Sequence, residues 1–142
     1  MGASATERLS AARAELNGRC NTIEEAYEFM LAYAGQGLAT DAGSAKGGQV
    51  REYLVKAEAA MGGLIALAAD FAGTTDAAVA PYAAFMDVIE RDARAARAAV
   101  ALVIVQPSIS SQVIDNLNAS IHLRALLTDL FLVDEVLKGH TA

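Results

Sequence analysis

Residues 49–71 read QVREYLVKAEAAMGGLIALAADF, and this stretch decides the fold class. Its larger apolar residues recur every three or four positions, which is the spacing of one face of an α-helix. They are Val50, Leu54, Ala57, Met61, Leu64, Ala68 and Phe71. Gly62 and Gly63 interrupt the run, and a glycine inside a helix costs about 1 kcal/mol relative to alanine. We therefore predict one long helix whose Gly-Gly pair lets a second helix approach closely.

The sequence after this stretch predicts two further long helices. Residues 76–105 carry an apolar stripe that runs from Tyr82 to Val103. The β-branched end of this segment, residues 100–105, could be a strand, but the helical spacing continues through it, so we favour a helix. Residues 111–137 form the last predicted helix, with serine N-caps before it and Gly139 after it.

The sequence before this stretch predicts two shorter helices. Residues 5–16 are rich in alanine and predict a short N-terminal helix, and residues 17–21 carry turn-forming residues. Thr22-Ile23-Glu24-Glu25 has the pattern of a capping box, which indicates that a second helix starts there and runs to Ala34. Matched long helices with short connections favour antiparallel neighbours. We therefore predict an all-α, up-and-down helical bundle of four main helices plus the short N-terminal helix.

The length of 142 residues suits a single domain over residues 1–142. Within it we expect residues 1–20 to be loosely docked and residues 35–48 to be a glycine-rich connection. The formal net charge is −6 with no basic stripe, which argues against nucleic acid and against an anionic membrane surface as partners. The one cysteine, Cys20, excludes an internal disulfide, and no leader or membrane-spanning pattern is evident. We expect a cytoplasmic protein.

The last predicted helix is apolar around more than one face. Ile114, Leu117 and Ile121 mark one stripe, and a second stripe continues to Leu137. A helix that is apolar over most of its circumference is buried on several sides, either in the bundle or at an interface between subunits. With few charges to cover the surface, we expect a symmetric homodimer. The interface is expected at Leu123, Leu126, Leu127 and Leu130.

The same helix carries the candidate ligand-binding residues. Asp115, Asn118, His122 and Asp129 follow one another along one ridge. A histidine near amide and carboxylate groups can act as a general base or line a pocket between helices. The predicted ligand-binding residues are Asn118, His122, Arg124, Asp115 and Tyr53, and Tyr27 is a further candidate hydroxyl. The alternative is that the ridge is the solvated face of an amphipathic helix, with Arg124 pairing locally.

Other candidate chemistry is weaker. The two histidines, His122 and His140, lack the Glu-x-x-His spacing of di-iron bundles, and we expect no metal and no cofactor. Residues 43–48 contain glycines and Lys46, but they lack the order of a phosphate-binding loop, so we interpret them as a connection that could cover a pocket. Cys20, expected just before a helix start, could be activated there, although an inert thiol is the simpler interpretation.

Two functions remain open from the sequence. The first is a non-enzymatic interaction module: a small cytoplasmic regulatory, assembly or accessory protein that binds another protein and forms a homodimer. Its basis is the lack of a catalytic motif together with the surplus of apolar helix surface. The alternative is a small-molecule-binding bundle, or a small enzyme, with its pocket between helices near His122.

Overall fold

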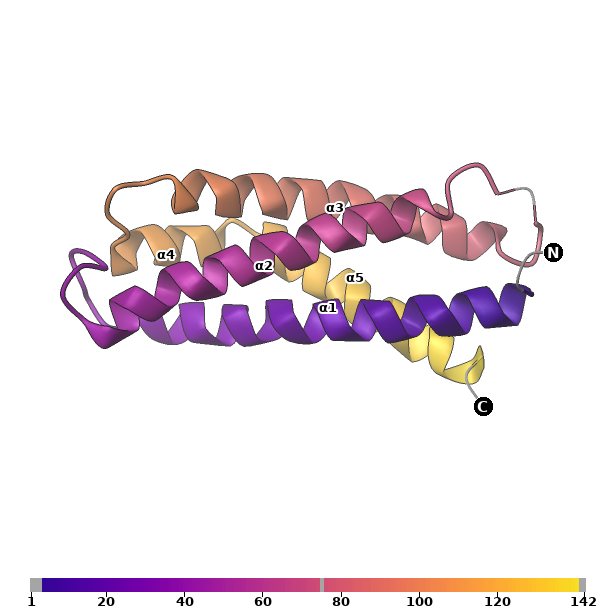
Figure 1. Cartoon of the computed structure of the whole chain (residues 1–142), viewed down its shortest axis with the longest axis horizontal. Helices are drawn as coiled ribbons and strands as arrows, with labels where there is room; N and C mark the ends of the chain where they lie inside the picture. Colours follow the sequence, from indigo (N-terminus) through magenta and orange to yellow (C-terminus); the bar gives the residue numbers. More distant parts are fainter. Residues whose placement is uncertain (1–3, 75, 141–142) are drawn as a thin grey trace.

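The computed structural model describes residues 4–74 and 76–140, and within these ranges the chain forms five α-helices and no strand. The helices are α1 (Ala5–Ala34), α2 (Ala45–Ala69), α3 (Ala80–Ile104), α4 (Ser111–Ala119) and α5 (His122–Leu137), and a 3-10 turn follows at Lys138–His140. α1, α2 and α3 run up and down beside one another, and α4 and α5 together complete the bundle (Figure 1). The predicted all-α, up-and-down bundle is confirmed.

α1 is a single helix, so the predicted turn at residues 17–21 is wrong. One apolar stripe runs without a change of phase through the expected break, and its members are buried: Leu9, Ala12, Leu16, Cys20, Ile23, Ala26, Met30 and Tyr33. Gly18 lies on the exposed face, where it costs only helix propensity. Thr22 is not an N-cap, because its hydroxyl donates to the Gly18 carbonyl one turn earlier, at 3.3 Å. The cap of α1 is Ser4, which accepts from the Glu7 amide.

The stripes predicted for α2 and α3 form the core. All seven predicted α2 residues, from Val50 to Phe71, are 5% exposed or less. α3 remains helical to Ile104, as the continued spacing predicted. The members of its apolar stripe from Met86 to Val103 are buried in the core. Tyr82 and Phe85, at the start of the same stripe, are only partly buried. No helix in the two described ranges is both long and apolar enough to cross a membrane.

The Gly62-Gly63 pair makes room for arginine side chains rather than for a helix backbone. A Cβ atom on Gly63 would overlap the guanidinium of Arg19, which reaches across from α1. A Cβ atom on Gly62 would lie 3.3 Å from the guanidinium carbon of Arg97, which reaches across from α3. Arg97 also pairs with Glu58 at 2.6 Å. The pair therefore accommodates two arginine side chains, one from each of the helices that pack against α2.

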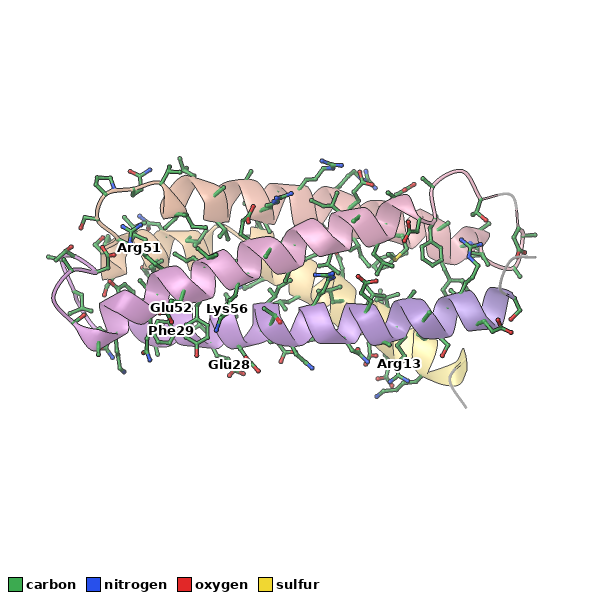
Figure 2. The ribbon with its side chains drawn as sticks, in the orientation of Figure 1. Arg13, Glu28, Phe29, Arg51, Glu52 and Lys56 are labelled. Atoms are coloured by element: carbon green, nitrogen blue, oxygen red, sulfur yellow. The ribbon has the colours of Figure 1, made fainter. Side chains whose placement is uncertain are left out.

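The glycine-rich connection is tied to the loop between α3 and α4. The Tyr33 hydroxyl donates to the Ile109 carbonyl at 2.6 Å, and the Ser111 hydroxyl donates to the Tyr33 carbonyl at 2.7 Å. The Ser111 hydroxyl also accepts from the Leu38 amide at 2.9 Å. Arg51 lies at the same end of the bundle (Figure 2) and pairs with Asp41. The connection over residues 35–44 is thus bonded to the end of the bundle.

Candidate functional site

The bundle is interrupted at one place, between α4 and α5, where a single helix over residues 111–137 was predicted. Ile121 adopts φ +66°, a left-handed conformation that costs a β-branched residue about 1–2 kcal/mol. Buried Leu117 and buried Leu123 are six positions apart, whereas two helical turns need about seven. The break corrects this phase difference, because it lets both residues face the core.

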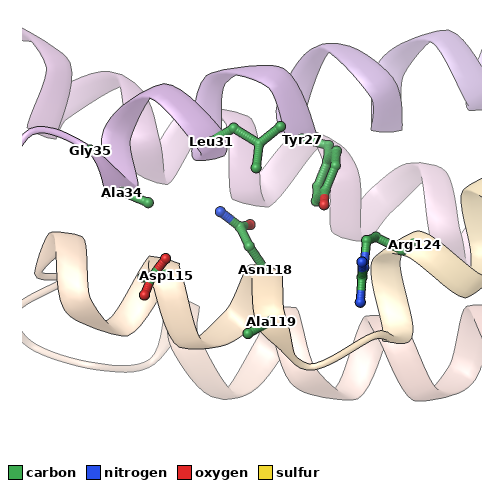
Figure 3. A pocket seen from close by; sticks show the side chains of 8 residues that line it. All are labelled: Tyr27, Leu31, Ala34, Gly35, Asp115, Asn118, Ala119 and Arg124. Carbon is green, nitrogen blue, oxygen red and sulfur yellow. The ribbon is translucent and has the colours of Figure 1, made fainter.

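The break opens a groove of about 540 Å³ between α1 and the α4–α5 junction. Figure 3 shows the eight side chains or backbone positions that line it. α1 contributes the upper wall and α4 and α5 contribute the lower wall. The lining residues are Tyr27, Leu31, Ala34, Gly35, Asp115, Asn118, Ala119 and Arg124.

Asn118 is the distinctive residue of this groove. Its side chain leaves α4 and points toward Leu31 of α1, with Tyr27 to one side (Figure 3). The residue is 6% exposed, and neither the amide nitrogen nor the amide oxygen has a hydrogen-bond partner among the described residues. Buried side-chain amides are nearly always bonded, and each buried group left unpaired costs about 1–3 kcal/mol. The fold therefore holds a donor and an acceptor against the groove at a cost in stability.

Opposite charges lie at the two ends of the groove. Asp115 stands beside Ala34 and Gly35 at the C-terminal end of α1, and Arg124 stands at the other end, in the first turn of α5 (Figure 3). Both charged side chains are exposed, and neither forms an ion pair with any residue in the described ranges. The first turn of α5 also has no side-chain cap among these residues, because Ile121 occupies the N-cap position.

The structure brings together three of the five predicted ligand-binding residues: Asn118, Arg124 and Asp115. His122 is exposed and does not line the groove, because the break at Ile121 turns it away from the ridge on which Asp115 and Asn118 lie. Tyr53 is on α2, where its ring stacks on Phe29 at 4.5 Å. The pocket predicted near His122 is therefore displaced to Asn118.

Asp129 is separated from the groove residues. It faces Asp92 of α3. The pKa of Asp129 is raised to about 7, mainly because the carboxyl group is buried, and in addition because it hydrogen-bonds to Asp92 and lies near the charge of Asp92. One of its carboxylate oxygens, Oδ2, is buried and has no hydrogen-bond partner in the described part of the chain. The ridge from Asp115 to Asp129 is thus divided by the break into two unrelated environments.

The four leucines predicted at a dimer interface are in the core of the single chain. Leu123, Leu126, Leu127 and Leu130 are 5% exposed or less. They cannot present a surface to a second copy, because their side chains already pack inside the bundle. The large apolar side chains that α5 does expose are Phe131, Leu132 and Val136, each about half exposed.

One lining residue, Leu31, was not among the candidates, whereas Tyr27 was named as a candidate hydroxyl. The apolar spacing within residues 22–34 alone favours Leu31 as a buried residue, but Leu31 is 50% exposed and Tyr33 is buried instead. The stripe that begins at Leu9 already fixed which face of α1 is buried, so treating residues 5–34 as one helix would have excluded Leu31. No pattern within residues 22–34 alone would have done so.

A second groove of similar size lies between α1 and α2, but its polar groups are already paired. It is lined in part by Glu15, Arg19 and Lys56. Arg19 pairs with Glu15 at 3.0 Å, and the Lys56 amine lies over the Tyr53 ring at 5.7 Å. This groove therefore has no group comparable to Asn118, whose donor and acceptor are both unpaired.

The remaining candidate chemistry does not converge on a site. Cys20 lies inside α1 rather than before a helix start, and burial, followed by the charge of Glu24, raises its pKa to about 11. Such a thiol stays protonated at neutral pH and is a poor nucleophile. The described residues contain no cluster of three or more metal-ligating side chains. The His140 side chain lies outside the described part of the chain.

Comparison with known proteins gave no match: no family model, no curated protein and no solved structure is significantly similar to this chain. The candidate site is therefore defined by its own geometry, as a groove with an unpaired buried amide between two opposite charges.

Proposed function

We propose that this chain is a non-enzymatic binding protein that holds a small polar molecule in the groove between α1, α4 and α5. The observation that carries the proposal is the Asn118 amide, which is buried beside the groove with both polar atoms unpaired. A ligand that hydrogen-bonds to this amide removes the free-energy penalty of leaving its buried donor and acceptor unpaired. The groove volume of about 540 Å³ falls within the usual 300–1,000 Å³ of small-molecule sites.

The lining residues favour binding over turnover. They include no serine, cysteine, histidine or lysine, so neither a hydroxyl or thiol nucleophile paired with a histidine base nor a lysine nucleophile is present in the lining. Leu31, half exposed, covers the amide from the α1 side, and exposed side chains change rotamer within nanoseconds. Leu31 can therefore move aside when a ligand enters. A single reduced cysteine fits the cytoplasm as the place where this binding occurs.

The test of this proposal compares the wild-type protein with Asn118→Leu, a variant of similar shape that removes both polar atoms. Native mass spectrometry of each protein as purified reports any retained mass that disappears on denaturation. We expect such a mass on the wild type and its loss in Asn118→Leu. Asn116→Leu is the matched control, since Asn116 is an exposed residue of the same helix, and it should keep the ligand.

The stability of the same variants gives a second readout that does not need a ligand. Removing an unpaired buried amide should raise the free energy of unfolding by about 1–3 kcal/mol, measured by urea denaturation. Both proteins are first unfolded and refolded to remove any retained ligand, because a bound ligand would itself stabilise the wild type. A drop in stability for ligand-free Asn118→Leu would show that the amide has a structural partner, and it would contradict the proposal.

Self-association is the second candidate function. Leu132 and Val136 lie one turn apart on α5 and border an apolar groove of about 350 Å³ whose other wall is Pro81 and Phe85 of α3. A second copy of this chain is the partner that an exposed apolar strip of this kind fits by symmetry. Sedimentation velocity should show a dimer for the wild type and a monomer for Leu132→Glu. Leu102→Glu, at an exposed position of α3, should remain dimeric. A monomeric wild type would exclude this candidate.

A further inference from the structure

The two ends of the groove between α1, α4 and α5 select opposite charges. At one end, the Asp115 carboxylate lies beside the C-terminal turn of α1, which carries no basic residue and is the negative end of the helix dipole. Both features attract a cation such as an ammonium group. This end of the groove therefore suits an amine.

The other end is built for an anion. The first turn of α5 presents backbone N–H groups that no side chain in the described ranges caps, and this is the positive end of the α5 dipole. Arg124 belongs to the same turn, and its guanidinium can bond a carboxylate with two parallel hydrogen bonds. A helix N-terminus with an arginine beside it suits a carboxylate.

The Asn118 amide lies between these two ends (Figure 3). A side-chain amide offers one acceptor oxygen and one donor nitrogen, which is the complement of the N–H and C=O of a peptide group. Leu31, Tyr27 and Ala119 give the walls beside it an apolar character. The groove thus presents, in order, a partner for an amine, a partner for an amide and a partner for a carboxylate.

Simpler ligands leave part of this arrangement unused. An inorganic anion would bind at Arg124 and α5 but would be repelled by Asp115. A metal ion or a polyamine would bind at Asp115 but would be repelled by Arg124. Only a zwitterion places a favourable charge at both ends.

We propose that the ligand is a dipeptide with free amino and carboxyl ends and apolar side chains. This inference rests on the proposed function and specifies its ligand class. The amine lies against Asp115, the carboxylate lies against Arg124 and the first turn of α5, and the peptide group bonds to Asn118.

The experiment is a crossed titration by calorimetry. The probes are alanyl-leucine, its N-acetyl form, which lacks the amine, and its C-terminal amide, which lacks the carboxylate. The proteins are the wild type, Asp115→Asn, Arg124→Gln and Asn118→Leu. We expect alanyl-leucine to bind the wild type at least about tenfold more tightly than either blocked form, because each blocked form loses one charge-assisted interaction.

The variants should separate the two ends. Arg124→Gln should weaken alanyl-leucine about tenfold but leave the affinity for the C-terminal amide unchanged, since that probe has no carboxylate to lose. Asp115→Asn should weaken alanyl-leucine in the same way but leave the N-acetyl form unchanged. Asn118→Leu should abolish binding of all three probes.

Three outcomes would overturn the inference, and they also distinguish it from the proposed function. If alanyl-leucine does not bind but the wild type retains a different mass that Asn118→Leu loses, the dipeptide is wrong and the binding site stands. If alanyl-leucine binds the wild type and Asn118→Leu equally, the site itself is wrong. If both blocked probes bind as tightly as the free dipeptide, the groove does not select charged ends.

Discussion

Arg51 and Asp41 are joined by a bond of 2.6 Å between Nε and a carboxylate oxygen, and both residues also hold the loop that leads from α3 into α4. Arg51 donates to the carbonyls of Ile104 and Gln106, at 3.0 and 2.7 Å. The second oxygen of Asp41 accepts from the Ile109 amide at 2.7 Å. One ion pair therefore fixes the entry to α4, and α4 carries Asp115 and Asn118.

Asp41→Ala should destabilise the chain by about 3 kcal/mol, because it leaves a partly buried guanidinium without its carboxylate and the Ile109 amide without its acceptor. Urea denaturation at neutral pH measures the change. Asp76→Ala, at an exposed position in the loop before α3, is the comparison and should cost less. An equal effect of the two substitutions would show that the ion pair contributes nothing specific.

The same ion pair gives acid sensitivity. Bonding to Arg51 lowers the pKa of Asp41 below its ordinary value of 3.8. A lowered pKa in the folded state contributes stability that is present above the ordinary pKa and is lost as the pH falls through the folded one. Asp41→Ala should therefore remove part of the stability loss below about pH 4, measured by urea denaturation at each pH.

Gly47 and Gly48 are neighbouring glycines in the first turn of α2, and only Gly47 lies in tight contact with the glycine-rich connection. Substitution of each by alanine therefore tests that contact. A Cβ atom on Gly47 would overlap the backbone of Asp41, which cannot move without breaking the Arg51 pair. Gly48 is exposed and has open space among the described residues where a Cβ atom would be. Gly47→Ala should lower the melting temperature, and Gly48→Ala should raise it because alanine favours the helix by about 1 kcal/mol. The reverse order would contradict the close approach at Gly47.

Asp129 gives the opposite pH dependence to Asp41. Its pKa is raised to about 7, so its protonated form is the one that the folded chain favours. This stability is fully present below the ordinary pKa of 3.8 and is lost as the pH rises toward 7. Asn at this position mimics the protonated form. Asp129→Asn should therefore be more stable than the wild type at pH 8, with a difference that shrinks toward pH 4 in urea titrations.

Asp87→Asn, at an exposed position of α3, is the control for this comparison and should show no such pH-dependent difference. If Asp129→Asn and the wild type change in parallel between pH 4 and 8, Asp129 is not protonated in the folded chain. Asp92→Asn should also remove the dependence in part, since its amide can donate to the Asp129 carboxylate.

The left-handed backbone conformation of Ile121 is expected to lower the stability of the folded chain, and a glycine at this position would remove that cost. Its φ of +66° suits glycine, and the side chain is 58% exposed, so removing it loses little apolar burial. Ile121→Gly should raise the free energy of unfolding by about 1 kcal/mol. Gly37, with φ +68°, is the reciprocal test: Gly37→Ala should lower the stability by a similar amount. No gain for Ile121→Gly in urea denaturation would mean that the left-handed conformation at the break is not strained.

The bundle could be predicted from the sequence because most helices keep one apolar stripe in phase. The stripe from Val50 to Phe71 predicted the buried face of α2, while the helix itself runs from Ala45 to Ala69 and ends before Phe71. Turn-forming residues were the weaker guide: Asn17 and Gly18 predicted a break in α1, but the apolar stripe through Leu16 and Cys20 overrides them. Burial of a continuous stripe yields more free energy than one exposed glycine costs.

The candidate site could be predicted only in part. Asp115, Asn118 and Arg124 belong to one short segment, so the sequence alone could name them together, and the structure places all three along the same groove. Tyr27 and Leu31 come from a different helix, and which face of α1 meets α4 depends on the packing of the whole bundle. His122 was placed on the ridge on the assumption that residues 111–137 form one continuous helix. The helix breaks at Ile121, and the sequence does not indicate this break because an isoleucine rarely adopts a positive φ.

The break at Ile121 makes the groove depend on the length of the chain as much as on its side chains. One extra residue between Ala119 and Leu123 would supply the missing position, so that α4 and α5 could join into one straight helix with both stripes facing the core. Arg124 would then turn relative to Asp115, and the order of charges along the groove would be lost. A single inserted codon would thus abolish the proposed binding while it lengthens the continuous helix.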